Sequence, residues 1–407
     1  MPDSIKKGDW SKPMAGLMTQ EETLQVMPKR QKLYIGVPSE AHTDESRVPL
    51  APSAVRNLSG QGHRVIIESG AGYLSHFTDH DYSEAGGEIA SDKREVYKAH
   101  TILKTAPLSA VEAEMLGQNQ VIISPLTIPY ATAEVLEILK KKKIIAIATE
   151  YLKDADGSFP MVRSMSEIAG ISVISIASSL MSTARDGIGK LLGGISGVPP
   201  AKVVILGAGI VAEYASRAAL GLGARVHIYD NSMYKLLRVQ NAIGQQLYTS
   251  TINLVDLQHD LSTADVVIGA IHSATGRAPI IVSEEMVMSM KTGSVIIDVS
   301  IDQGGCFETS EVTSLERPTF QRHGVIHYCV PNITSRYPQT SSKAISNILQ
   351  PLLTAAASHG GMENLIAQRA GLRHGVYTYH GCLTNEYLAR RFQMKYTDLD
   401  LIIPSVF

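Results

Sequence analysis

The stretch that most constrains the fold is residues 202–230, KVVILGAGIVAEYASRAALGLGARVHIYD, in which an apolar run leads into a G-x-G-x-x-A pattern. In such a pattern Gly207 permits a tight turn and Gly209 lets the backbone approach a pyrophosphate, while the small Ala212 allows close packing of the following helix. The N-terminus of that helix offers N–H groups and a favourable dipole to phosphates. The stretch therefore predicts a dinucleotide-binding βαβ unit rather than a glycine turn of purely structural use.

A carboxylate closes this unit at the end of its second apolar run. Asp230 stands where an acid accepts hydrogen bonds from the adenosine ribose hydroxyls and repels a 2′-phosphate, which predicts NAD as the cofactor in preference to NADP. Lys235 follows one turn into the next helix. We predict that Lys235 contacts the adenosine side of the cofactor; an exposed lysine without a ligand is the alternative.

Apolar runs typical of strands alternate with helical stretches over most of the chain, on both sides of the glycine-rich stretch. Those outside it span residues 32–40, 63–72, 101–107, 144–152, 266–271, 294–300 and 325–330. This alternation predicts an α/β fold with two Rossmann-like domains, mostly parallel sheets and a cofactor cleft between the domains.

The domain boundaries follow from changes in composition. Residues 1–31 are polar and form an N-terminal extension, with one short helix expected over 19–27. We assign residues 32–160 together with 339–407 to a substrate-side α/β domain, because the C-terminal end is too small to fold alone. Residues 161–338 form the predicted NAD-binding Rossmann domain.

Charge and composition exclude several classes of function. The net charge of −2, from 37 Lys+Arg and 39 Asp+Glu, gives no basic surface for nucleic acid. No apolar run reaches the roughly 20 residues that span a bilayer, and the three cysteines Cys306, Cys329 and Cys382 fit neither a disulfide framework nor a zinc motif. His76 and His80 lie in a stretch typical of a solvated loop, so no metal site is predicted. We expect a cytoplasmic protein without membrane insertion.

An acid and two glycines follow the run at residues 294–300. In open α/β sheets ligands bind outside the carboxyl ends of the strands, so Asp302 is expected to face the cofactor cleft. Gly304 and Gly305 remove side chains where a nicotinamide ring or another backbone comes close. The alternative is that Asp302 only caps a turn. Asp298 lies inside the run and is expected to be a structural partner.

Longer motifs give the chain a resemblance to a known family. From Lys32 to about Leu388 it resembles the alanine dehydrogenase and pyridine nucleotide transhydrogenase α-subunit family, and it is closer to the alanine dehydrogenase branch. The matching runs are IGVPSE, ESRVPLAP, GHRVIIESGAG, MSEIAG, GVPPAKVVILGAGIVAEYA, GSVIIDVSIDQGG, HGVIHYCVPN and RAGLRHGVYTYHGCLT. The transhydrogenase's Arg-Gln-Asp loop has no counterpart among them.

The resemblance implies roles for particular residues. Asp302 is the acid beside the nicotinamide and a catalytic candidate, Ser166 and Asn332 are cofactor contacts, and Arg47 holds the substrate carboxylate. A guanidinium in the loop after the first strand suits that task, because it can bind a carboxylate through two parallel hydrogen bonds. The alternative for Arg47 is a surface ion pair with Glu45. The predicted cofactor contacts further include Ile271 and Ile301.

Two substrate-side positions depart from the family pattern. The family has a lysine in a Lys-Val-Lys-Glu-Pro run, where this chain reads LKTAP: Lys104 is kept, but the substrate lysine position is Thr105 or Ala106. The family's catalytic histidine is replaced by Thr127. A threonine does not titrate near neutrality and cannot take over proton transfer directly. The nearby groups that could refill the pocket are Lys104, Tyr130, Glu150 and Tyr151.

Three hypotheses for function follow. The first is an NAD-dependent amino acid dehydrogenase of alanine dehydrogenase type that acts on a small amino or keto acid, with Arg47, Lys104 and Thr127 on the substrate side. The second is an NAD-binding regulatory protein, or an enzyme with another substrate, that has lost alanine chemistry. The third is a transhydrogenase-like component that needs a partner subunit. We expect a homo-oligomer, a dimer or a hexamer.

Overall fold

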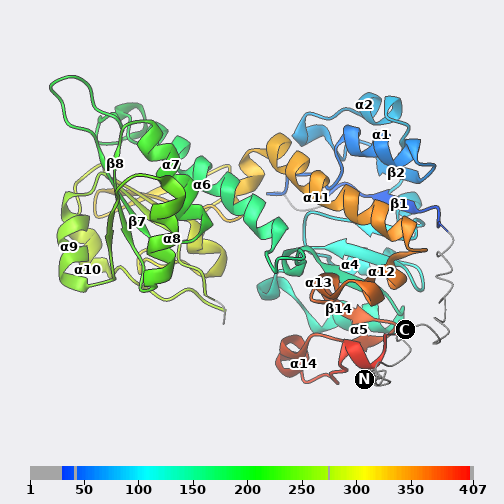
Figure 1. The fold of residues 1–407 in the computed structure, drawn as a ribbon. Helices are drawn as coiled ribbons and strands as arrows, with labels where there is room; N and C mark the ends of the chain where they lie inside the picture. Colours follow the sequence, from blue (N-terminus) through cyan, green and yellow to red (C-terminus); the bar gives the residue numbers. More distant parts are fainter. Residues whose placement is uncertain (1–29, 41–43, 274–275, 404–407) are drawn as a thin grey trace, which may run out of the picture.

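Two lobes, each built on one β-sheet, make up the molecule (Figure 1). The computed structural model describes residues 30–40, 44–273 and 276–403. The helix expected over residues 19–27 lies outside the described residues. Because both sheets are mostly parallel and are covered by helices, the predicted α/β class with two Rossmann-like units is confirmed.

The first sheet has the strand order β15-β14-β6-β5-β4-β1-β2-β3. Its six N-terminal strands pair in parallel, and β14 pairs antiparallel with β6, so the C-terminal part of the chain returns to this sheet. The exact domain boundaries at residues 160 and 338 stay a prediction. The strands are β1 (Tyr34–Val37), β2 (Arg64–Glu68), β3 (Glu88–Ala90), β4 (Thr101–Leu103), β5 (Val121–Ser124), β6 (Ile145–Ala148), β14 (Val376–Tyr379) and β15 (Cys382–Leu383).

The second sheet has the order β12-β13-β11-β10-β7-β8-β9, with β12 as its one antiparallel strand among the described residues. The chain order reverses direction between β7 and β10, which is the point where open α/β sheets bind ligands. The strands are β7 (Lys202–Leu206), β8 (Arg225–Tyr229), β9 (Tyr248–Ser250), β10 (Val266–Gly269), β11 (Val295–Asp298), β12 (Thr319–Arg322) and β13 (Val325–Tyr328).

Helices cover both faces of each sheet. In the first lobe one face carries α1, α11 and α12, and the other carries α4, α5 and α14. In the second lobe α6, α7 and α8 pack on one face, and α9 and α10 on the other. The helices are α1 (Pro52–Gly60), α2 (Asp79–Glu84), α3 (Lys93–Val96), α4 (Ala110–Met115), α5 (Ala133–Lys141), α6 (Pro160–Leu180), α7 (Ile210–Gly221), α8 (Met233–Ile243), α9 (Leu254–Thr263), α10 (Glu284–Met288), α11 (Pro338–Ser358), α12 (Met362–Gln368), α13 (Ala370–Arg373) and α14 (Glu386–Phe392).

The central strands are buried on both faces, which explains their continuous apolar sequences. Successive side chains of a strand point to opposite faces. Ile122 accordingly packs under α4 and α5, while its neighbour Ile123 packs on the side of α1 and α11. The same alternation separates Val203 from Val204 in the second lobe. Sheets of this kind need helices on both faces, and this chain supplies them.

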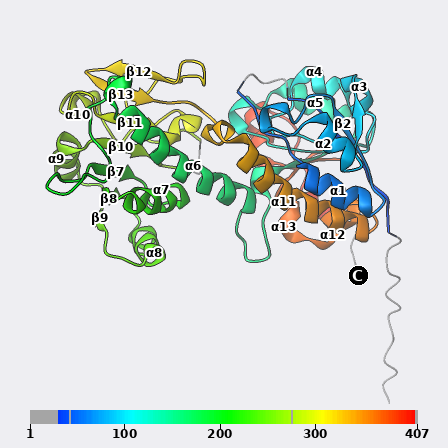
Figure 2. The ribbon, with the colours of Figure 1, turned by 90° about the horizontal axis from the view of Figure 1, so that it is seen from above.

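Two long helices run between the lobes, α6 and α11 (Figure 2). Each begins with a proline at its first position, Pro160 and Pro338, where the missing N–H leaves no hydrogen bond unmade. Helix α6 approaches α7 closely at Gly170, where an added Cβ would lie 2.5 Å from the Val211 carbonyl oxygen. This contact holds α6 against the second lobe.

Further findings concern membranes and metals. Within the described ranges no helix has both the length and the apolar character needed to cross a bilayer. The same residues hold no group of three or more His, Cys, Asp or Glu arranged to bind a metal ion.

The loop expected around His76 and His80 is only partly found, because a capping box at Thr78 starts α2 and places His80 in a helix.

Candidate functional site

The glycine-rich turn between β7 and α7 has the geometry that its sequence predicts. Gly207 has φ +103°, and its N–H donates to the Tyr229 carbonyl at 2.6 Å. A Cβ at Gly207 would press against the Ala270 carbonyl oxygen, so only glycine fits there. Gly209 caps α7, and a Cβ added to it would meet no atom within 4 Å. The turn thus leaves open space in front of the N-terminus of α7, as a pyrophosphate requires.

Asp230 lies at the end of β8 and braces this turn. Its Oδ2 accepts the Ala208 N–H at 2.8 Å and its Oδ1 accepts the Ser232 N–H at 2.7 Å. Each carboxylate oxygen keeps further lone-pair capacity for a ribose hydroxyl. Because Asp230 is tied to the turn, the position of its charge is fixed relative to any phosphate held at α7.

Basic side chains lie on α8 and near the glycine-rich turn. Lys235 is exposed in the first turn of α8. Burial, with a smaller contribution from the charge of Lys235, lowers the pKa of His272. Arg238 donates to the Ala208 carbonyl at 3.0 Å and pairs with Glu213 at 2.8 Å. His272 and Arg238 were missed from the sequence, since their approach to the turn depends on how α8 and the β10 loop pack.

These residues fit NAD, with an open Gly209, an available helix N-terminus and a fixed carboxylate at the end of β8. We expect NADH to bind at least about 100-fold more tightly than NADPH, because a 2′-phosphate beside a fixed carboxylate costs several kcal/mol. Fluorescence titration with both nucleotides measures the ratio. Asp230→Asn should reduce the ratio at least about tenfold, since it removes the charge and keeps an acceptor. Equal affinities in the unaltered protein would contradict the assignment.

Three further predicted cofactor contacts lie on three other elements of the chain. Ile271 follows β10, and its N–H donates to the Ser300 hydroxyl at 2.9 Å. Ile301 is buried in the short 3-10 helix η5 (Val299–Gln303). Ser166 lies partly exposed on α6. Their contacts with the cofactor stay predictions.

Asp302 lies in η5, just beyond the end of β11. The residue is exposed, but desolvation of its carboxyl group by the surrounding protein raises its pKa against the opposing effects of the Asn332 N–H and Arg47. Among the described residues its hydrogen-bond donor is the Asn332 N–H, at 2.9 Å from Oδ1. Asp302 therefore combines exposure at the protein surface with a carboxyl group that holds a proton more readily than usual.

The residues around Asp302 are structural. Asp298 is buried and accepts hydrogen bonds from the Ser300 N–H, the Cys306 N–H and the Ser310 hydroxyl, in agreement with the role expected for it. Gly304 and Gly305 have φ +89° and +81°. Glycine at these positions is already required by the positive φ angles and by the closeness of Arg277 and Asp298, and the predicted approach of a nicotinamide ring stays a prediction.

Asn332 connects the two lobes. Its N–H donates to Asp302, and its side-chain amide donates to Glu45 Oε2 at 3.0 Å. It adopts φ +51°, a left-handed conformation that asparagine tolerates, at the start of the 3-10 helix η6 (Ile333–Arg336). In this structure the Asn332 side-chain amide forms a hydrogen bond between the lobes. The predicted contact with the cofactor would have to be made by other atoms of Asn332.

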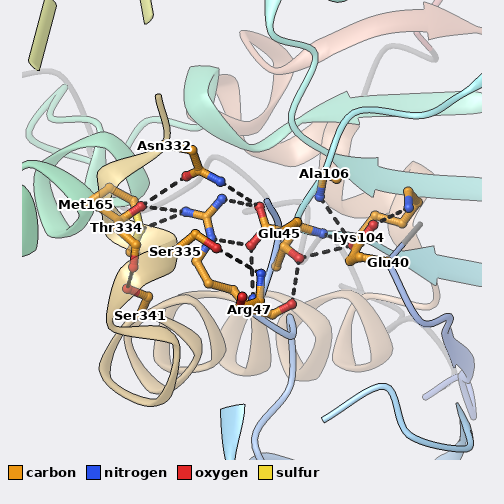
Figure 3. A network of polar contacts seen from close by, with 12 residues as sticks. Glu40, Glu45, Arg47, Lys104, Ala106, Met165, Asn332, Thr334, Ser335 and Ser341 are labelled. Carbon is orange, nitrogen blue, oxygen red and sulfur yellow. Dashed lines mark hydrogen bonds and ion pairs between the residues drawn. The ribbon is translucent and has the colours of Figure 1, made fainter. Parts of the chain in front are cut away.

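Arg47 is held by a buried ion pair, which Figure 3 shows together with its neighbours. Its Nε donates to Glu45 Oε1 at 2.7 Å and its Nη2 to Glu45 Oε2. The side chains are only 10% and 3% exposed, so the pair with Glu45 considered from the sequence exists, but it lies inside the protein rather than on its surface. Nη1 donates to the Thr334 hydroxyl at 2.8 Å.

Lys104 lies next to this network but is sealed from the cleft. Its side chain is 1% exposed and contacts the carboxylates of Glu40 and Glu112. Burial lowers the pKa of Lys104, but the two carboxylates outweigh it and the pKa lies above its usual range. Glu40 also accepts the Thr105 N–H and hydroxyl. A substrate could reach Lys104 only after these side chains rearrange, so its substrate role stays a prediction.

Thr127 has an unusual backbone for a β-branched residue, with φ +43° and ψ +80°. The buried Glu150 carboxylate holds it there by accepting the Thr127 N–H at 2.8 Å and the Leu126 N–H at 3.0 Å. Burial raises the pKa of Glu150, against the effect of these N–H groups. Tyr130 is 60% exposed in the same loop, and Tyr151 is half-buried beside Glu150. Sequence alone gives no sign that Glu150 positions Thr127.

Two family models match the chain, one after the other. The model described as "Alanine dehydrogenase/PNT, N-terminal domain" matches residues 36–169, and "Alanine dehydrogenase/PNT, C-terminal domain" matches residues 173–386. Together they cover both lobes.

Relatives and solved structures agree with these matches. The chain is 36% identical over 370 residues to an alanine dehydrogenase of Staphylococcus haemolyticus (strain JCSC1435), covering 90% of this chain and 98% of the relative. Alanine dehydrogenase 2 of Staphylococcus aureus (strain USA300) gives 36% identity with coverage of 90% and 99%. A solved L-alanine dehydrogenase superimposes with a TM-score of 0.83 at 34% identity, covering 88% of this chain and 99% of the other. A transhydrogenase from Sinorhizobium meliloti, at 23% identity and with a TM-score of 0.74, covers 87% and 99% and shares the fold.

Proposed function

This chain belongs to the alanine dehydrogenase and pyridine nucleotide transhydrogenase (PNT) family, and from that membership we propose that it transfers hydride between NAD(H) and a small amino or keto acid. The reaction class is that of the alanine dehydrogenases, to which the chain is similar over 90% of its length. Which acid it accepts would depend on the residues around Arg47 and Asp302.

The observation that carries the proposal is the hydrogen-bonded connection between these two residues. Asp302 belongs to the cofactor lobe and Arg47 to the other, yet the Asn332 N–H contacts Asp302 while the Asn332 amide contacts Glu45, which holds Arg47. These contacts link a cation that is able to bind a carboxylate with an acid of raised pKa at the junction of the two lobes. An amino acid dehydrogenase needs both, one to orient the substrate and one to support proton movement.

In the proposed reaction each group would have a separate role. The N-terminus of α7 and Asp230 would hold NAD, which supplies a hydride acceptor or donor when bound. Arg47 would bind the substrate carboxylate and fix the reacting carbon on the cofactor side of the cleft. Asp302 would hold or release a proton at its carboxyl oxygen beside the reacting atoms, for which its raised pKa is suited.

A second function has support from one observation. Among the described residues near the cleft, the cations Arg47 and Lys104 are both paired with carboxylates, so a small keto acid meets no unpaired positive charge from either. This arrangement favours weak alanine chemistry, another substrate, or a regulatory protein that only binds NAD. A transhydrogenase-like component has only the shared fold in its support.

An assay of turnover beside binding tests these functions. We expect NADH to bind, and L-alanine oxidation to be about 10²- to 10⁴-fold slower than in an enzyme with a histidine at the Thr127 position, because general acid–base catalysis contributes that much. The assays are L-alanine with NAD at alkaline pH, and pyruvate with ammonia and NADH near neutrality, together with larger apolar 2-oxo acids. Robust alanine turnover would contradict the expected loss. NADH binding without turnover of any acid would favour the regulatory function.

The assembly and the location remain proposals. We propose a cytoplasmic homo-oligomer, a dimer or a hexamer, whose size light scattering would measure directly. A monomer at micromolar concentration would contradict it.

A further inference from the structure

The guanidinium of Arg47 is not held equally on all sides. An arginine has five N–H donors in a fixed plane. Glu45 takes one edge, through Nε and Nη2, and the Thr334 hydroxyl accepts from Nη1. The other contact to Nη1 is the Met165 sulfur, at 3.5 Å. A thioether is a weak acceptor. Met165 therefore covers the part of the guanidinium that is bound least strongly.

The opposite edge is poorly suited to an incoming carboxylate. Glu45 is 3% exposed and also accepts the Arg47 N–H at 3.0 Å and the Asn332 amide at 3.0 Å. Displacing it would leave a buried carboxylate without its cation, which is strongly unfavourable. An anion that reaches Arg47 is thus expected to replace the sulfur and to leave Glu45 in place.

The position of Met165 connects it with both halves of the site. It lies on α6, which runs between the lobes, and directly precedes Ser166, a predicted cofactor contact. In Figure 3 Met165 lies on the side of Arg47 away from Lys104. Its side chain is half-buried, and methionine has three rotatable bonds that let it move aside without disturbing the helix.

We propose that Met165 is a specificity-determining residue, whose thioether occupies on Arg47 the place that the substrate carboxylate takes and then packs beside the substrate's side chain. This inference rests on the proposed function, because it assumes a 2-oxo acid or amino acid as the ligand. It adds which group the substrate displaces and which side chain limits its size.

Two variants of Met165 test separately the contact that the substrate displaces and the limit on the size of the substrate side chain. Met165→Leu keeps most of the volume but removes the acceptor, so the KM for pyruvate should fall about threefold as a weak competitor is lost. Met165→Ala opens space, so kcat/KM for 3-methyl-2-oxobutanoate relative to pyruvate should rise at least about tenfold, while Met165→Leu should leave this ratio unchanged. Met161→Leu is the matched control. Met161 lies one turn earlier on α6 but in the core, and its replacement should change neither quantity.

Calorimetry of pyruvate binding to the NADH complex keeps the inference separate from the proposed function. If no 2-oxo acid is turned over but pyruvate binds more tightly to Met165→Leu, the proposed reaction fails and the role of Met165 stands. If turnover occurs while pyruvate affinity and substrate preference are the same in all Met165 variants, the inference about Met165 is wrong. Absence of pyruvate binding to the unaltered protein would overturn both.

Discussion

Asp302→Asn should leave the fold intact and lower the rate of hydride transfer by about 10²- to 10⁴-fold, the usual contribution of a positioned acid or base. The asparagine oxygen can still accept the Asn332 N–H, so the contact between the lobes is kept. What is lost is a group that can release and regain a proton in the cleft. The measurement is single-turnover oxidation of NADH with the best 2-oxo acid, after NADH binding has been matched between the two proteins.

Asp298→Asn is the control for this substitution, because it changes a carboxylate four residues earlier that does not face the cleft. Asp298 is buried and accepts three hydrogen bonds, which an amide cannot all replace. We expect it to lower the free energy of unfolding by roughly 1–3 kcal/mol and to leave activity per folded molecule nearly unchanged. If Asp302→Asn behaved in the same way, Asp302 would be only a turn cap.

The raised pKa of Asp302 fixes the sign of its effect on stability. Burial makes ionisation less favourable in the folded state than in the unfolded state. Below the unfolded pKa the carboxyl group is protonated in both states and does not lower the free energy of unfolding. As the pH rises through the folded pKa, the ionised carboxylate destabilises the fold. The asparagine variant should therefore be at least as stable as the unaltered protein near neutrality, and this advantage should vanish below the ordinary pKa of 3.8. Urea unfolding at about pH 3 and about pH 7 would compare the two proteins.

The parts of the site that follow from local sequence could be predicted. The turn at Gly207 depends on one backbone conformation, and the acid at Asp230 depends on where the second strand ends, so a short stretch of sequence contains both. Asp302 was predictable for the same reason, since it follows a strand. The α/β fold class needed only the alternation of apolar runs and helices.

The rest depends on contacts between distant parts of the chain. Asn332 and Glu45 are 287 positions apart, and Lys104 and Glu40 are 64 apart. The pair of Arg47 with Glu45 was the alternative considered from the sequence, because the two residues are close in the chain. No periodicity or motif shows that Lys104 is neutralised by Glu40 and Glu112, because that ion pairing depends on how separate loops meet. The backbone conformation of Thr127 could not be predicted either, since its N–H is held by Glu150 from the 3-10 helix η3 (Thr149–Tyr151) after β6.

These unpredicted contacts change the interpretation of the departures from the family pattern on the substrate side. Thr105, one of the two positions considered for the substrate lysine, is not merely an absent cation, because its N–H and hydroxyl both donate to Glu40. Glu40 in turn holds Lys104 in the interior. The loop after β4 is thus stabilised as a buried charge cluster, and Lys104 contributes to stability in this conformation instead of to the cleft.

Lys104→Met should lower the free energy of unfolding by about 3–5 kcal/mol, because it leaves Glu40 and Glu112 buried without their cation. Burial raises the pKa of Glu112, but Lys104 and the Ser109 groups outweigh this and hold the pKa below its usual range. The stability that Glu112 contributes is therefore present above its unfolded pKa and lost as the pH falls through its folded pKa. In Lys104→Met this loss in acid should be smaller, and guanidinium unfolding at pH 7 and pH 4 measures both effects.

Two further variants show whether the buried charge is the cause. Lys93 lies 3.9 Å from the same Glu112 carboxylate but its side chain is 22% exposed, so Lys93→Met should cost only about 1 kcal/mol. Combining Lys104→Met with Glu40→Gln and Glu112→Gln removes the unpaired charges and should restore most of the lost stability, because a buried ion pair contributes little against neutral groups of similar size. If Lys104→Met fails to fold while the triple variant folds, the expectation is met. A cost below 1 kcal/mol for Lys104→Met would instead mean that the lysine is free to leave the cluster, which would return it to the candidates for the substrate cation.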